Sequence, residues 1–146
     1  LEDPPLEVAV RMGATRTINV NRETSVLDAF AKDSGHFDLA FECSAAAPAI
    51  EAAIRALRPR GTMIQVGVRG PAAIPINMLV ARELRLQGSH RFHAEFAEAV
   101  EMIVSDRIDV APIVTHRFAL AEAGRAFALA ADRRVAVKVQ LSFGGA

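Results

Sequence analysis

Residues 37–68 read FDLAFECSAAAPAIEAAIRALRPRGTMIQVGV, and this stretch decides the fold. Alternating apolar residues at its start predict a short strand that ends at Glu42 and Cys43. Four apolar residues then recur at helical spacing, namely Ile50, Ala53, Ile54 and Leu57. A second buried strand follows at residues 63–66 and stops at Gly67. Two strands joined by a helix are expected to be parallel, with a right-handed crossover.

Polar or small residues stand at the carboxyl ends of three expected strands. The first two ends are Cys43-Ser44 and Gly67-Val68, and a third strand at residues 84–88 ends at Ser89-His90-Arg91. Carboxyl ends of parallel strands lie side by side on one edge of a sheet, and ligands bind outside that edge. The three ends are therefore the strongest functional signal in the pattern.

The helix of the central stretch has a predicted stop signal. Arg58 and Arg60 suit the negative end of a helix, Pro59 cannot extend one, and Gly61 turns the chain. Apolar periodicity and the positions of Gly, Pro and capping residues predict the other elements of the chain. The expected helices are at 3–12, 26–34, 75–81, 93–105 and 120–131, and the expected extended segments are at 17–20, 113–118 and 135–141. Regular alternation predicts an α/β fold with a mainly parallel sheet and helices on both faces.

Local signals refine three of these helices. Asp3 before Pro4-Pro5 is typical of an N-cap, and Ser25 to Asp28 resembles a capping box. The helix at 93–105 is expected to turn its apolar residues inward, and these are Phe96, Val100, Ile103 and Val104.

Composition narrows the class of protein. The chain has 146 residues, 51% of them hydrophobic, and a formal net charge of zero, so one domain with a real core is expected. No block of Lys or Arg favours nucleic acid or an acidic membrane surface as a partner, and no apolar run reaches the roughly 20 residues that cross a bilayer. Cys43 is the only cysteine, which excludes an intrachain disulfide and suits the cytoplasm. Tyr is absent, so there is no phenolic acid or base.

Each candidate residue has a functional and a plain interpretation. Arg91 is either a clamp on a phosphate, hydroxyl or carboxylate, or a surface arginine. Gly67 either allows a ligand to approach the backbone or is a turn glycine. Cys43 is either a nucleophile or, as is commoner for a lone cysteine after a buried strand, a small core residue. The histidines do not have metal-binding spacing; His36, His93 and His116 are read as structural or surface residues, and His90 gains interest from its neighbour Arg91.

Five segments, in order and spacing, carry a family resemblance. They are FDLAFECS (37–44), RGTMIQVGV (60–68), LRLQGSHRFHAEF (84–96), IVTHRF (113–118) and VAVKVQLSF (135–143). Together they resemble the carboxyl-terminal part of zinc-dependent medium-chain alcohol and polyol dehydrogenases. Within the sorbitol dehydrogenase branch, GS-x-RF followed by EF, with the closing KVQL-x-F, is most similar to L-idonate 5-dehydrogenases.

The resemblance implies an enzyme that oxidises L-idonate at C5 to 5-keto-D-gluconate, with NAD or NADP as hydride acceptor and a zinc ion whose ligands lie outside this chain. It implies cofactor contacts at three places, namely Cys43 and Ser44, then Val66, Gly67 and Val68, then Ser89, His90 and Arg91. Arg91 also reaches substrate. Phe92 replaces a tyrosine of sorbitol dehydrogenases, which argues against sorbitol. Pro5 stands where relatives often have an arginine, so the choice between NAD and NADP stays open.

The resemblance also divides the chain. Residues 1–111 correspond to the remainder of a dinucleotide-binding domain, and 112–146 to a segment that returns towards the catalytic domain. The glycine-rich phosphate loop is absent from the sequence, so a truncated Rossmann-like sheet, an inactive isolated fragment and an unpaired strand at 17–20 are expected. A homodimer is expected through the edge strand Leu84–Gly88. Three alternatives stay open. They are a sorbitol or other polyol dehydrogenase, a non-catalytic module that acts only in dimer assembly, and another α/β class such as a flavodoxin-like or methyltransferase domain.

Overall fold

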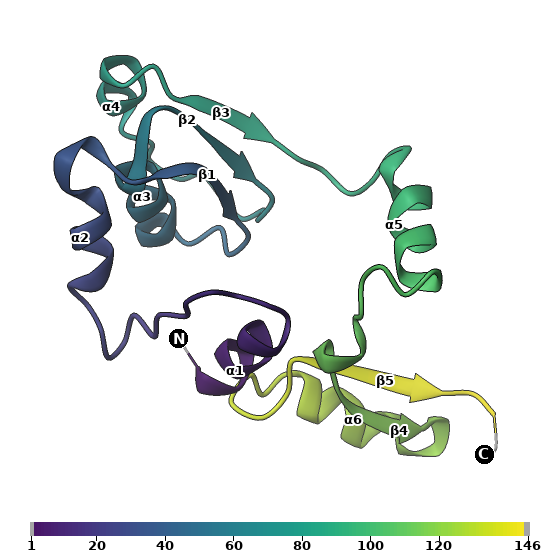
Figure 1. Cartoon of the computed structure of the whole chain (residues 1–146). Coiled ribbons are helices and arrows are strands. Elements are labelled where there is room, and N and C mark those ends of the chain that lie inside the picture. The colour runs from purple at the N-terminus through teal and green to yellow at the C-terminus, as the bar shows by residue number, and fades with distance from the viewer. Residues whose placement is uncertain (1, 145–146) are drawn as a thin grey trace. The chain divides into compact units, whose positions relative to one another are not determined.

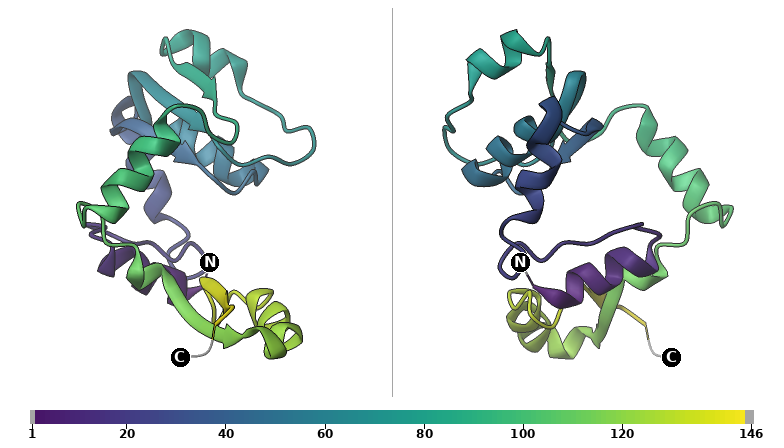
Figure 2. Two further views of the ribbon diagram at one scale, coloured as in Figure 1. Left: turned by 90° about the vertical axis from the view of Figure 1, so that its right-hand side faces the viewer. Right: turned by 60° about the vertical axis from the view of Figure 1, so that its left-hand side comes forward.

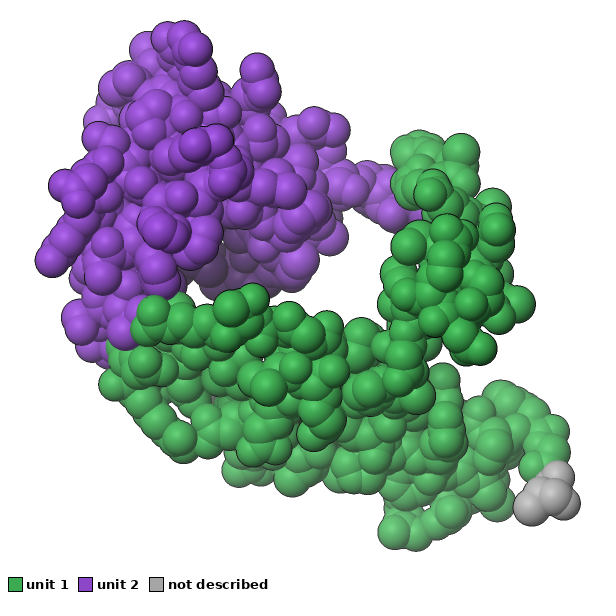
Figure 3. Space-filling model, viewed as in Figure 1, with its two compact units in different colours: residues 1–23, 93–146 green, residues 24–92 purple. Residues whose placement is uncertain are grey.

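The computed structural model describes residues 2–144 and divides into two compact units. One unit comprises residues 24–92, and the other comprises residues 1–23 with 93–146 (Figure 3). Each unit has its own parallel sheet, one of three strands and one of two. The predicted α/β class is thereby confirmed. No helix within the described range is both long and apolar enough to cross a membrane.

The unit of residues 24–92 contains the predicted strand–helix–strand stretch (Figure 1). Its strands are β1 (Phe37–Glu42), β2 (Leu57–Gln65) and β3 (Arg85–Gly88), parallel and in the order β1-β2-β3. Its helices are α2 (Val26–Ala31), the short 3-10 helix η1 (Lys32–Ser34), α3 (Ala47–Ala56) and α4 (Ile76–Ala81). β1 and β2 are parallel and joined through α3, as predicted.

The core of this unit lies between α3 and the sheet. Ile50 and Ile54 on α3 pack with Leu57 and Met63 on β2, and Leu57 is fully buried. Met78 and Leu79 of α4 pack against the same cluster. Burying each such side chain contributes about 1.5–3 kcal/mol. This packing fixes one face of the sheet.

The opposite face of β1 is open in the described chain. Leu39 and Phe41 alternate with the helix-covered Ala40, and they are 47% and 65% exposed. The outer edge of β1 also has no partner strand among residues 2–144, since β1 pairs only with β2.

The end of α3 differs from the prediction. Arg58 to Gly61 lie within β2 and not at a helix end, because the chain passes from helix at Ala56 to strand at Leu57. They form an irregularity in β2, since the register with β1 jumps from Leu57 to Thr62 and Arg60 has a φ of 65°. Arg82 donates from Nη1 to the carbonyl oxygens of Arg55 at 3.0 Å and Leu57 at 3.1 Å. An arginine distant in sequence therefore serves the last carbonyls that Arg58 and Arg60 were expected to serve.

The other unit contains α1 (Asp3–Arg11), α5 (Glu95–Val104), β4 (Val114–Ala119), α6 (Ala123–Ala130) and β5 (Lys138–Ser142), with short 3-10 helices η2 (Ala111–Ile113) and η3 (Leu120–Glu122) (Figure 2). β4 and β5 are parallel and α6 packs on both, as a second strand–helix–strand arrangement. Val8, Ala126 and Ala136 are its buried apolar residues.

The segment at Thr17–Val20 is unpaired, as expected, but it is not a strand. Residues 16–19 form no ladder, because no strand of residues 2–144 lies beside them to accept their backbone hydrogen bonds. Asn19 is instead buried and donates from Nδ2 to Asp3 Oδ1 at 2.8 Å. A side chain therefore holds this segment against α1.

Two further local predictions are also wrong. Asp3 is the first residue of α1 rather than its N-cap, because its carboxylate binds Asn19 and pairs with Arg22 at 2.6 Å. Ser25 precedes α2 but makes no capping hydrogen bond.

The apolar face of α5 is exposed, not inward. No other described helix or strand packs extensively against α5, so its apolar side chains stay open to solvent; they are Phe96, Val100, Ile103 and Val104.

Candidate functional site

The three strand ends predicted to converge do so in the unit of residues 24–92. The backbone N–H groups of Val66 and Gly67 donate to the carbonyl oxygen of Glu42 at 2.8 and 2.9 Å. The N–H of Ser89 donates to the carbonyl oxygen of Gln65 at 2.9 Å. The ends of β1, β2 and β3 therefore form one continuous edge, which we call the strand-end edge (residues 42–46, 65–68 and 88–89).

His90 and Arg91 extend beyond the strand-end edge. Both side chains are exposed, and no hydrogen bond or ion pair joins either of them to another of residues 2–144. Arg91 has a φ of 57°, an unfavourable left-handed conformation for a residue other than glycine. Six other described residues share such a positive φ, so this conformation does not decide between the functional and the plain interpretation of Arg91.

Glu42 organises the edge, and sequence reasoning missed it as a site residue. The residue is only 5% exposed, yet its carboxylate accepts four hydrogen bonds. Ser44 donates twice to Oε1, from N at 2.8 Å and from Oγ at 2.5 Å. Ala45 N and Gln65 Nε2 donate to Oε2 at 2.8 and 2.5 Å. A glutamate at the end of an apolar strand, with serine two residues later, was the available signal.

The charge state of Glu42 follows from these contacts. Burial alone raises the pKa of a carboxylate, but hydrogen bonds from Ser44, Gln65 and Ala45 outweigh it and hold the pKa of Glu42 below its ordinary value. Glu42 is therefore ionised at neutral pH. It is a buried anion stabilised by neutral donors.

Ser44 is turned inward by this network. Its hydroxyl donates its one proton to Glu42 and accepts a hydrogen bond from Ala46 N at 3.2 Å. A direct contact from Ser44 to a ligand would therefore use its backbone carbonyl, not the hydroxyl donor.

Gly67 is required by packing, which neither interpretation of the sequence anticipated. A Cβ at this position would lie 2.5 Å from Ala45 N and 2.8 Å from the Cys43 carbonyl carbon. No real side chain tolerates such contacts. The end of β2 thus lies directly against the turn that follows β1.

That turn contains a strained residue. Ala45 has a φ of 55°, and its N–H is held by Glu42 Oε2. The left-handed conformation costs a non-glycine residue roughly 1–2 kcal/mol. The hydrogen bonds of Glu42 offset this cost and fix the turn.

A hollow of about 260 Å³ adjoins the turn. Its lining comes from the turn, the start of α3 and the loop after β2, and consists of Ala45, Ala47, Arg69, Gly70, Pro71 and Ala72. Small residues leave room there, and Arg69 supplies positive charge. The hollow could hold part of a ligand that reaches the strand-end edge.

Cys43 is exposed, so the expectation of a small core residue is wrong. Strand alternation directs Glu42 inward, which leaves the next side chain pointing to solvent. No described residue group provides three His, Cys, Asp or Glu side chains placed to hold a metal ion.

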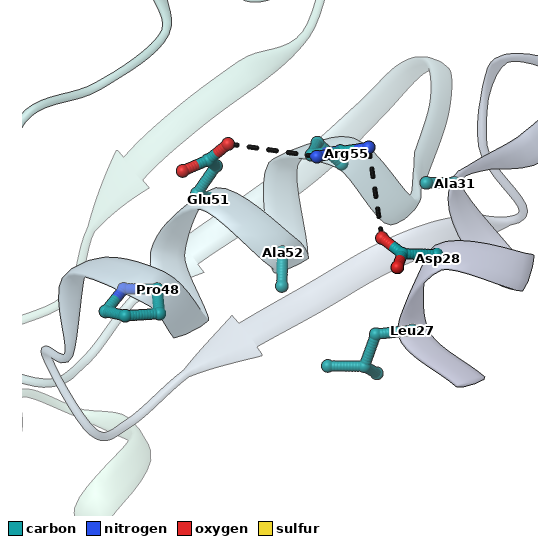
Figure 4. Close-up of a pocket in the computed structure, with 7 residues that line it drawn as sticks. All are labelled: Leu27, Asp28, Ala31, Pro48, Glu51, Ala52 and Arg55. Atoms are coloured by element: carbon teal, nitrogen blue, oxygen red, sulfur yellow. Dashed lines mark ion pairs between the residues drawn. The ribbon is translucent and has the colours of Figure 1, made fainter. Parts of the chain in front are cut away.

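A second hollow lies between α2 and α3 (Figure 4). Arg55 of α3 reaches across it to Asp28 of α2 at 3.9 Å and pairs along its own helix with Glu51 at 3.9 Å. The charged side chains that line this hollow therefore pair with one another. The hollow contains none of the predicted site residues. The strand-end edge is therefore the stronger candidate site.

Comparison with known proteins shows the family of this chain. A family model described as "Zinc-binding dehydrogenase" matches residues 3–105, which is most of the chain. The chain belongs to the zinc-binding dehydrogenase family. The resemblance stated from the sequence motifs is confirmed at this level.

Relatives within the zinc-binding dehydrogenases are named for different substrates. L-idonate 5-dehydrogenase (NAD(P)(+)) of Escherichia coli is 32% identical over 139 residues, covering 94% of this chain and 40% of its own length. A putative D-xylulose reductase of Rhizobium meliloti is 35% identical over 145 residues, covering 97% of this chain and 42% of its own. The chain therefore spans about two fifths of these relatives.

A solved structure has the same fold. The crystal structure of L-idonate 5-dehydrogenase from Escherichia coli superposes with a TM-score of 0.75 at 33% identity, covering 80% of this chain and 34% of that one. The Rossmann-like assignment is thereby supported.

Proposed function

We propose that the protein is an NAD(P)-dependent polyol or sugar-acid dehydrogenase that oxidises L-idonate at C5 to 5-keto-D-gluconate. The observation that carries this proposal is the strand-end edge, where three parallel strands of a zinc-binding dehydrogenase end together. The 5-hydroxyl loses its proton and C5 loses a hydride, so the products are the ketone, NAD(P)H and a proton.

The strand-end edge would receive the nicotinamide end of the cofactor, which accepts the hydride. Cys43 and Ser44 line one side of this position, and Val66, Gly67 and Val68 present backbone to it. Val68 is 81% exposed, so the stretch is open to a ligand. Ser89, His90 and Arg91 would close over the nicotinamide.

Arg91 would also bind substrate. Its guanidinium is exposed and unpaired in the described chain, and it has the geometry to bind a sugar-acid carboxylate with two hydrogen bonds. Phe92 is 62% exposed and has no hydroxyl to offer to sorbitol. Both features favour a sugar acid over a neutral polyol.

The described residues do not provide a site for the zinc ion of the family, since no group of three His, Cys, Asp or Glu side chains that could bind it occurs among residues 2–144. We assign its ligands to sequence outside this chain. Residues 1–111 are proposed as the remainder of the nucleotide-binding domain and 112–146 as the returning segment, with the enzyme acting in the cytoplasm.

A substrate comparison tests the proposal. Full-length protein is supplied with NAD+ or NADP+ and with L-idonate, sorbitol or xylitol, and reduced cofactor is followed by absorbance. L-idonate is expected to give the highest kcat/KM, and zinc chelation is expected to abolish it. No turnover on any polyol or sugar acid would overturn the proposal, and a preference for sorbitol would overturn the substrate assignment.

A second function, assembly without catalysis, is favoured by two open strands. All four residues of β3 are exposed, and no strand of residues 2–144 pairs with its outer edge or with that of β1. Exposed edges pair readily with other strands. The 146-residue chain is expected to bind NAD(P)H weakly and to form a homodimer through Leu84–Gly88. Tight NAD(P)H binding by a monomeric chain would argue against this second function.

A further inference from the structure

Burying the carboxylate of Glu42 costs desolvation free energy that an apolar side chain at this position would not. Glu42 is 5% exposed, and it forms no ion pair with any cation of residues 2–144. Desolvating a carboxylate costs several kcal/mol, and apolar residues of similar volume often stabilise such positions better. The four hydrogen bonds therefore indicate a purpose beyond filling space.

Those hydrogen bonds join the two segments proposed to receive the nicotinamide. On one side the carboxylate holds Ser44 N, Ser44 Oγ and Ala45 N, which sets the turn after β1. On the other side it accepts from Gln65 Nε2, which also donates to the Gly67 carbonyl oxygen at 2.9 Å.

The backbone of Glu42 also joins the turn at residues 43–46 to the backbone at residues 66–68, and we call this place the junction. Its carbonyl oxygen accepts hydrogen bonds from both Val66 N and Gly67 N. One residue thus determines the position of both segments, through its side chain and its main chain. Its carboxylate oxygens are occupied, so it does not itself face a ligand.

We propose that Glu42 is a positioning residue, which acts through Ser44 and Gln65 to hold the turn at residues 43–46 and the backbone at residues 66–68 where they receive the nicotinamide end of NAD(P). The inference rests on the proposed function. Beyond the residues proposed to contact the cofactor, it assigns Glu42 and Gln65 an indirect effect on cofactor affinity. The two side chains act by holding the contacting segments in place.

Two substitutions break the junction in different ways. Glu42→Gln keeps the shape but replaces one acceptor oxygen with an NH2 group, which must face a donor from Ser44, Ala45 or Gln65. Gln65→Met keeps the length but removes both bonds made by Nε2. Glu51→Gln is the matched control, because Glu51 lies on the exposed surface of α3.

The measurements are made on full-length protein, well below the unfolding temperature of each variant. The dissociation constant for NADH is measured by fluorescence, and hydrogen exchange is followed at the amides of Ser44, Ala45 and Gly67. Glu42→Gln and Gln65→Met are each expected to raise the dissociation constant about tenfold, because the two segments would then be in the binding-competent arrangement only about a tenth of the time. The same variants should exchange these amides faster, whereas Glu51→Gln should match wild type.

The outcomes separate the two proposals. Unchanged NADH affinity in both variants, with wild-type binding intact, would overturn the role of Glu42 and leave the proposed function standing. Lower thermal stability with unchanged affinity would show a purely structural role and would also overturn it. Failure of wild-type protein to bind NADH would overturn the proposed function, and this inference with it.

Discussion

The side-chain amide of Gln65 lies 2.5 Å from the carboxylate of Glu42, across the last paired residues of β1 and β2. Each side chain comes from a different strand, and the two strands are joined only through α3. The contact locks the ends of β1 and β2 together at the position proposed for the cofactor.

Substitution of Gly67 by alanine should disrupt the junction. Its Cβ would lie 2.5 Å from Ala45 N, so the turn or the strand must move. The free energy of unfolding is expected to fall by about 1–3 kcal/mol, as for other overpacked sites. Urea unfolding of both proteins measures the difference.

Gly88→Ala is the matched control. Gly88 ends the neighbouring strand β3, and a Cβ there would meet nothing within 4 Å. Its effect should stay within about 0.5 kcal/mol. Equal effects of the two substitutions would contradict the packing role of Gly67.

Ala45→Gly should behave unlike an ordinary alanine-to-glycine change. Ala45 has a φ of 55°, which glycine adopts without strain. The substitution should therefore be neutral or stabilise the fold by up to about 1 kcal/mol. Ala52→Gly, inside α3, should instead destabilise it by about 0.5–1 kcal/mol. A loss of stability at Ala45 equal to that at Ala52 would argue against strain in the turn.

Acid should weaken the fold through Glu42. Because folding lowers the pKa of Glu42, its ionised carboxylate stabilises the folded state above its ordinary pKa of 4.5. This contribution is lost as the pH falls through the lowered pKa. Glu42→Gln should therefore have a lower free energy of unfolding at pH 7 and a smaller decrease between pH 7 and pH 3.

A second acid provides the comparison for this pH dependence. Asp132 pairs with exposed Arg134, whose hydrogen bonds lower the pKa of Asp132 to about 2. Solvent screens this pair, so Asp132→Asn should alter the pH dependence less than Glu42→Gln does. The reverse order, measured by urea unfolding at each pH, would contradict the assignment.

Arg91→Ala should impair catalysis without unfolding the protein. The side chain is exposed and makes no contact that stabilises the described chain. Loss of a bidentate contact to the substrate carboxylate should lower kcat/KM for L-idonate by at least tenfold. Arg133→Ala, at an exposed position that belongs to neither the strand-end edge nor β3, is the control. Wild-type kinetics in Arg91→Ala would remove its proposed role.

The sequence was sufficient for the elements with clear periodicity. The stretch 37–68 predicted β1, α3 and β2, because apolar spacing reflects the packing of Ile54 and Met63 in the core. The same logic predicted the convergence of strand ends at Ser44, Gly67 and Ser89, since parallel strands end on one edge.

The features that the sequence did not predict depend on contacts between residues that are distant in sequence. Residues 17–20 have strand-like composition, but a strand requires a partner, and Asn19 binds Asp3 instead. The role of Glu42 depends on Gln65, which is distant in sequence and adjacent only through sheet register. The packing role of Gly67 likewise depends on where the turn at Ala45 lies.

The central claim, that the strand-end edge is the nicotinamide site, can be tested at Cys43. Its thiol is exposed beside Ser44. Full-length protein is alkylated with iodoacetamide, with and without saturating NADH, and modification of the peptide containing Cys43 is timed by mass spectrometry. The account predicts that NADH slows alkylation of Cys43 at least several-fold, while adenosine alone leaves it unchanged. An alkylation rate of Cys43 that is the same with bound NADH as without it would contradict the account.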